Sequence, residues 1–127
     1  AAKLLHCRSL GLLARKDYPG ASEAADKLAS LPPHDDVPTF QAINLYDAAC
    51  LLSLASAAAA KDEDLGEADR AALAEKYATR AVALLKEDRS LGYFKDPAKV
   101  AHMKQDTDLA PLRDRDDFKE LEEDLQK

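Results

Sequence analysis

Apolar residues recur every three or four positions along most of the chain, which is the spacing of a helix with one buried face. Prolines, glycines and clusters of charge interrupt the pattern, most clearly at Pro32-Pro33 and at Gly92. The pattern predicts helices over about residues 4–16, 21–31, 37 or 39 to 60, 66–90, 97–103 and 116–126, with a brief turn over 109–113. Pro19 is tolerated in the first turn of the second helix, and Asp36 and Asp96-Pro97 are typical of helix starts.

The third predicted helix lacks a polar stripe. Between residues 42 and 60 the polar positions are Asn44, Asp47, Ser53 and Ser56. A helix that is apolar on nearly every side is covered by neighbours in several directions, and its alanines allow those neighbours to approach closely. We therefore expect this helix at the centre of the fold.

The fourth predicted helix has one buried face and one wet face. The buried stripe is expected to contain Ala74, Tyr77, Ala78, Ala81, Leu84 and Leu85. The wet face is expected to carry Glu67, Arg70, Glu75, Lys76, Arg80 and Lys86. Asp64 and Glu67 have the spacing of a capping box at the start of this helix, and Gly92 is expected to end it. After it, Tyr93-Phe94 is expected to form an aromatic plug, and the last helix is expected to present Phe118, Leu121 and Leu125 inward.

The composition agrees with a helical protein. Among 127 residues there are 25 alanines and 20 leucines, whereas the β-branched residues that favour strands are scarce. The predicted fold class is all-α, with antiparallel helical hairpins and a short helical C-terminal cap. We interpret residues 1–127 as one domain, with a first hairpin over 1–33, a longer second hairpin over 37–90 and capping helices over 95–127.

The formal net charge is −6, and the excess of acid lies in residues 34–64 and 95–127. Nucleic acid is not an expected partner, because binding phosphates requires a clustered positive field. No apolar run is long enough for a membrane span, and no secretory signal is visible. Cys7 and Cys50 are too few for a disulfide framework and are interpreted as buried small hydrophobes, so a cytoplasmic location is expected. Because Ala1 is not a natural start, we expect the sequence to be a piece of a longer protein.

Motifs for catalysis are missing from the sequence. It contains neither a glycine-rich phosphate loop nor a G-x-S-x-G elbow, so no enzymatic activity and no cofactor are expected. No metal site is expected either, because His6 and Cys7 point to different faces of a helix and no second Cys or His follows at helical spacing. Asp114, Asp116 and Asp117 lack the pattern of a calcium loop and are interpreted as stabilising the start of the last helix.

Small and bulky residues alternate in these hairpins in the order of a tetratricopeptide repeat. Cys7-x-x-Leu10-Gly11-x-x-Ala14 and Tyr46-x-x-Ala49-Cys50-x-x-Ser53 resemble the first helix of such a repeat. Second-helix positions are matched by Ala21, Ala25, Leu28 and Pro33, and again by Ala74, Ala78 and Ala81. The small residues let two helix axes approach, and the bulky neighbours fill the flanks.

Four further stretches resemble, in order, the helical-repeat region that follows the catalytic domain in some bacterial serine/threonine protein kinases. They are Tyr46-Asp-Ala-Ala-Cys50, Tyr77-Ala-Thr-Arg-Ala-Val82, Gly92-Tyr-Phe-Lys-Asp-Pro97 and Leu109-Ala-Pro-Leu-Arg-Asp-Arg-Asp-Asp-Phe118. The resemblance covers about residues 42–126, while residues 1–33 match only a generic repeat. It implies a scaffold or recruitment role in a larger bacterial protein.

In such repeats the first helix of each pair lines a peptide-binding groove. By the resemblance, the contact positions are Leu5, Arg8, Leu12 and Arg15 in the first unit, and Asn44, Asp47, Leu51 and Leu54 in the second. Arg8 and Arg15 share a face and suit a carboxylate, although ordinary surface charge also explains them. Asn44 and Asp47 share a face too, and a buried hydrogen bond or a pair with an arginine of the first hairpin is their alternative interpretation.

The sequence therefore predicts a non-catalytic module that binds a protein or peptide partner through Arg8, Arg15, Asn44 and Asp47. One alternative is a purely structural segment that packs against its own parent chain. A less favoured alternative is a helical bundle that binds a small molecule. The oligomeric state stays open.

Overall fold

The structure is a computed structural model that describes residues 18–29 and 38–126. The elements in these ranges are α2 (Tyr18–Ala29), α3 (Pro38–Ala60), α4 (Glu67–Ser90), η1 (Tyr93–Lys95), α5 (Pro97–Gln105), η2 (Thr107–Leu112) and α6 (Asp116–Gln126). The described chain contains no β-strand, so the all-α prediction is confirmed. The helix predicted over 4–16 and the Asp36 cap lie outside the described residues.

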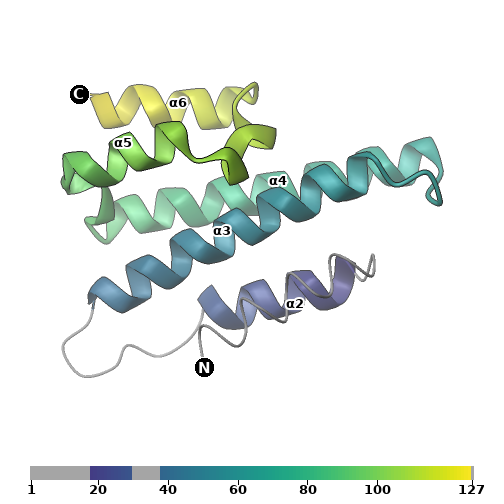
Figure 1. Cartoon of the computed structure of the whole chain (residues 1–127), viewed down its shortest axis with the longest axis horizontal. Helices are drawn as coiled ribbons and strands as arrows, with labels where there is room; N and C mark the ends of the chain where they lie inside the picture. The colour runs from purple at the N-terminus through teal and green to yellow at the C-terminus, as the bar shows by residue number, and fades with distance from the viewer. Residues whose placement is uncertain (1–17, 30–37, 127) are drawn as a thin grey trace.

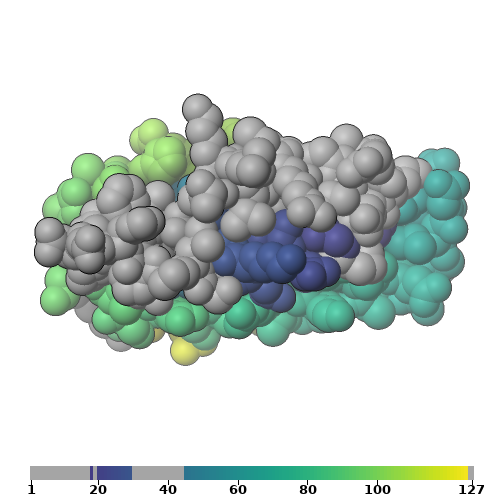
Figure 2. Space-filling view, turned by 90° about the horizontal axis from the view of Figure 1, so that it is seen from below, coloured from purple at the N-terminus to yellow at the C-terminus, as the bar shows by residue number. Residues whose placement is uncertain are grey.

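Helix α3 lies at the centre, as the apolar character of its own residues predicted. It contacts α2 on one side and α4 on another, and η1 and η2 pack against it as well (Figure 1). Helix α6 packs on α4, and α5 contacts η1. Helix α2 contributes to the face seen in Figure 2. None of the helices in the described ranges is long and apolar enough to cross a membrane.

Buried alanines and leucines have different roles in the packing of α3. Buried alanines with an exposed fraction of at most 1% lie along the helix at Ala48, Ala49, Ala55 and Ala59. Leu45, Leu51 and Leu52 are each 1% exposed and fill the space beside these small residues. Truncating one such leucine to alanine typically costs about 2 to 5 kcal/mol. The stability of the fold therefore depends on α3 being covered on several sides at once.

Helix α2 begins at Tyr18, three residues earlier than predicted, with Pro19 in its first turn as expected. Its predicted stripe of Ala21, Ala25 and Leu28 is buried. The Tyr18 hydroxyl donates a hydrogen bond of 2.8 Å to the buried carboxylate of Asp62, in the turn between α3 and α4. This bond connects the start of α2 to the far end of the central hairpin.

The predicted capping box at the start of α4 is wrong. The N-cap position is Gly66, which offers no side chain, so Asp64 does not cap the helix. Instead Asp62 accepts the backbone N–H of Asp64 at 3.0 Å, which closes a tight turn two residues long. The buried stripe predicted for α4 is confirmed except at Ala74, which is half-buried.

After α4 the chain breaks and starts a new helix at the positions that the sequence predicted. Gly92 has a φ of 89°, a left-handed conformation that glycine adopts without strain, and it ends the helix. Phe94 is buried and its ring centroid lies 5.1 Å from that of Tyr93 and 6.4 Å from that of Tyr46, so the expected aromatic plug is present. The Asp96 carboxylate accepts the N–H of Ala98 at 2.9 Å and caps α5, which runs two residues beyond its predicted end.

Helix α6 is held by an apolar stripe and by one arginine. Phe118 and Leu121 are buried, as predicted, and Leu125 packs against the core. Arg115, just before the helix, donates to Glu75 of α4 at 2.7 Å and to Asp117 at 3.0 Å. The arginine lowers the pKa of Asp117 below its ordinary value, so this carboxylate is ionised in the first turn, where the exposed N–H groups favour negative charge.

Asp88 is a buried carboxyl group that the sequence pattern did not single out. It is 0% exposed, and neither of its oxygens has a hydrogen-bond partner in the part of the chain that the structure describes. Burial, together with the neighbouring charges of Glu87 and Asp47, raises its pKa to about 8 from an ordinary 3.8. The group is therefore mostly neutral at pH 7, because the folded protein has no favourable place for its charge.

We expect Asp88→Asn to flatten the dependence of stability on pH. The folded state holds this proton more tightly than the unfolded state, so the wild type loses stability as pH rises between about 4 and 8. Each pH unit in that window costs at most about 1.4 kcal/mol. The variant should match the wild type near pH 4 and be clearly more stable at pH 8, by urea unfolding. An Asp88→Asn profile parallel to the wild type would contradict this account, and exposed Glu120→Gln serves as the control.

Candidate functional site

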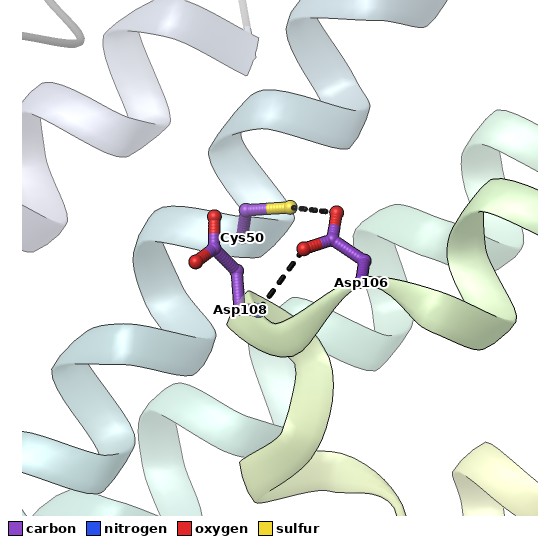
Figure 3. Close-up of side chains that lie close together, drawn as sticks. All are labelled: Cys50, Asp106 and Asp108. Carbon is purple, nitrogen blue, oxygen red and sulfur yellow. Dashed lines mark hydrogen bonds between the residues drawn. The ribbon is translucent and has the colours of Figure 1, made fainter.

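The densest cluster of reactive side chains in the described structure lies where the C-terminal segment crosses α3. Cys50 projects from α3, Asp106 precedes η2, and Asp108 lies in its first turn (Figure 3). One ligand atom from each of these residues lies within 4.8 Å of the others. Cys50 lies 56 residues before Asp106 in the sequence, so packing of η2 on α3 creates the cluster.

Asp106 connects the parts of this site. Its Oδ2 accepts the Tyr46 hydroxyl at 2.6 Å and the Cys50 thiol at 3.8 Å. Its Oδ1 accepts the backbone N–H of Asp108 at 3.0 Å, which caps η2. His102, four residues earlier on α5, places Nε2 3.4 Å from the same Oδ2. One carboxylate thus joins α3, α5 and η2.

Backbone contacts hold this junction in position. The Ser53 hydroxyl of α3 donates to the carbonyl of Asp108 at 2.7 Å. The Arg113 guanidinium donates from Nη2 to the carbonyls of Met103 and Asp106, at 3.0 and 2.9 Å. These bonds hold the backbone from the end of α5 to the first turn of η2, so the Asp106 and Asp108 side chains are held close to Cys50.

The field at the site is strongly negative. Burial raises the pKa of the Cys50 thiol far above its usual range, and Asp106, Asp108 and Asp47 raise it further. Burial and the hydrogen bond to Asp106 likewise raise the pKa of Tyr46. Both groups therefore hold their protons at neutral pH and act as hydrogen-bond donors rather than as nucleophile or base. The arrangement places one sulfur donor and two carboxylates within 4.8 Å of one another.

Of the four residues predicted to bind a partner, one is described with its side chain. Arg8 and Arg15 lie outside the described residues, and the Asn44 side chain is outside them too. Asp47 is half-buried on α3, one turn before Cys50, and its charge raises the pKa of Cys50 and Asp88. Asp47 is thus the predicted binding residue whose charge acts on the Cys50 thiol of the Asp106 cluster.

Two leucines that the resemblance assigned to the groove have different surroundings. Leu51 is 1% exposed and belongs to the core, so it does not line a surface groove in this structure, and that assignment is wrong. Leu54 is half-buried. Helix α3 has neighbours on several sides, so a residue expected on a concave surface is covered.

The sequence analysis did not identify Tyr46, His102, Asp106 or Asp108 as members of a site. No cysteine or histidine follows Cys50 at helical spacing, and its neighbours Asp106 and Asp108 lie outside α3. Two local signals were present. Tyr46 and Cys50 are four residues apart on one helix face. His102 lies four residues before Asp106, which directly follows α5.

We expect Tyr46→Phe to destabilise the fold. The substitution removes the 2.6 Å bond to Asp106 and leaves a partly buried carboxylate with one donor fewer, at a cost of about 1 to 3 kcal/mol. Tyr93→Phe is the matched control, because the Tyr93 ring packs on the same plug while its hydroxyl has no hydrogen bond within the described ranges. Equal losses in urea unfolding for the two variants would show that the Tyr46 hydroxyl contributes nothing.

Comparison with known proteins gives this chain no relatives: no protein-family model, curated protein or solved structure matches it.

Proposed function

We propose that the chain is a non-catalytic module that binds a protein or peptide partner, built from helical hairpins of tetratricopeptide-repeat type. The observation that carries the proposal is the position of α3 between α2 and α4. In an array of helical repeats, the first helix of a pair packs against its own partner and against the second helix of the preceding pair. The contacts of α3 with both neighbours support this arrangement.

The binding face is proposed to include Arg8, Arg15, Asn44 and Asp47. Support comes from Asp47, whose half-buried carboxylate interrupts a helix that is otherwise nearly apolar. A partner with a cationic side chain would be attracted to the negative field that Asp47 shares with Asp106 and Asp108. A few anchors of this kind would contribute most of the binding free energy.

The parent protein is proposed to be a larger bacterial protein such as a serine/threonine kinase. Support is limited to the order of the Tyr46–Cys50, Tyr77–Val82, Gly92–Pro97 and Leu109–Phe118 stretches along the chain. In that setting the module would recruit substrates or assemble complexes in the cytoplasm, away from nucleic acid and membrane.

Charge reversal tests the binding face. The double variant Arg8→Glu/Asp47→Lys and a matched control, Lys119→Glu/Glu120→Lys on the exposed side of α6, keep the same net charge as the wild type. We expect the immobilised wild type and the control to capture the same partner from bacterial lysate. The Arg8/Asp47 variant should capture about tenfold less of that partner. Circular dichroism and thermal melting check that all three are folded.

The result also separates the two kinds of role. A partner that binds the Arg8/Asp47 variant as well as the wild type would show that another surface binds. If no form of the chain captures a partner, the result would favour a structural segment that packs against its parent protein.

A further inference from the structure

We propose that Cys50, Asp106 and Asp108 bind a divalent transition-metal ion of the Zn²⁺ class. This inference goes beyond the proposed partner binding and does not depend on it. It also departs from the expectation drawn from sequence, because the ligands are brought together by the packing of η2 on α3 and not by spacing along one helix.

The geometry needs little adjustment to hold such an ion. Zinc lies about 2.3 Å from thiolate sulfur and about 2.0 Å from carboxylate oxygen, so tetrahedral ligand atoms are about 3.5 Å apart. The Cys50 Sγ and Asp106 Oδ2 are already 3.8 Å apart, and all three ligand atoms lie within 4.8 Å (Figure 3). Small side-chain rotations would bring them to one ion.

The carboxylates at the site lack a permanently charged basic partner in the described ranges. Within residues 18–29 and 38–126, neither Asp106 nor Asp108 forms an ion pair with lysine or arginine, and the Asp108 carboxylate makes no hydrogen bond. Two carboxylates and a sulfur atom thus lie within 4.8 Å of one another without lysine or arginine beside them. A divalent cation at this place would be attracted by both carboxylates.

The donor types select the class of ion. A thiol is a poor ligand for Mg²⁺ and Ca²⁺, which prefer oxygen, whereas Zn²⁺ and Co²⁺ accept sulfur, oxygen and imidazole nitrogen. His102 offers a fourth ligand, since its Nε2 lies 3.4 Å from Asp106 Oδ2 and its side chain is 63% exposed. The Tyr46 hydroxyl would remain on Asp106 as an outer hydrogen bond that orients the carboxylate.

Binding is a ligand exchange in which atoms and charge balance. The metal–sulfur bond forms as the S–H bond of Cys50 breaks, and the proton passes to solvent. Asp106 exchanges its contact with the Cys50 thiol for a metal bond, and Asp108 gains a metal bond, without a change of protonation in either carboxylate. No oxidation or reduction is involved. The bound ion would join α3 directly to the segment between α5 and η2, and so stabilise the folded state over the unfolded one.

Cobalt is the probe that reports on the sulfur ligand. The whole chain, treated with a chelator and then freed of it, is titrated with Co²⁺ while the thiolate-to-cobalt charge-transfer absorption is followed. We expect the absorption to saturate at one equivalent and to disappear when Zn²⁺ is added. Cys50→Ser should abolish it, whereas Cys7→Ser, which removes the other thiol, should leave it unchanged.

A second pair of variants tests the carboxylates. Asp108→Asn should weaken Co²⁺ binding by about tenfold or more, and Asp114→Asn, an exposed aspartate outside the cluster, should not change it. Circular dichroism confirms that each variant is folded, and the Asp108 pair keeps the test valid should Cys50→Ser unfold. Absence of the absorption in the wild type, its survival in Cys50→Ser, or equal affinity of the two aspartate variants would overturn the proposal.

Discussion

Helix α3 has neighbours on several sides, and this burial constrains every polar atom that it carries. A buried polar group without a partner costs roughly 1 to 3 kcal/mol, so the few polar side chains of α3 must find partners inside the protein. Ser53 donates to the carbonyl of Asp108, and Ser56 donates to the carbonyl of Ala74, both at 2.7 Å. Tyr46 and Cys50 donate to Asp106. These bonds point to α4 and η2, and they determine where those elements can pack.

The position of the C-terminal segment on α3 is explained by the same need for hydrogen-bond partners. It supplies the acceptors that α3 requires, through the carboxylate of Asp106 and the carbonyl of Asp108, while Leu109 and Leu112 enter the core beside them. Arg113 then satisfies the carbonyls of Met103 and Asp106 at the bend. The short helices after α4 are thus part of the single core and not an appendage to the hairpin. The acidic cluster near Cys50 is a consequence of this route across α3.

Local pattern was sufficient to predict most of the helices. The scarcity of polar residues between 42 and 60 predicted the central helix, and Gly92 and Asp96-Pro97 predicted the break and restart after α4. These features act within a few residues of themselves, so the sequence displays them directly. The capping box failed because Gly66, between Asp64 and Glu67, is the actual N-cap and the Asp62 side chain closes the preceding turn. Periodicity also left Asp88 unassigned, although the structure buries it completely.

The site was less predictable, because its members meet through packing between distant segments. Nothing near Cys50 in the sequence indicates that Asp106 and Asp108 will lie beside it. The resemblance to repeat proteins led to Asp47, which does lie next to the cluster, and also to Leu51, which the core covers. A pattern that identifies which helix carries a surface does not determine which of its faces stays open.

The central claim is that α3 is the element on which the rest of the fold packs. Hydrogen exchange of backbone amides tests it most directly, with the free energy of exchange compared with that of global unfolding in urea. The account predicts that amides over residues 45–59 exchange only when the whole protein unfolds, whereas those of α6 exchange through smaller openings. Exchange of the α3 amides at a lower free energy than those of α4 or α6 would contradict it.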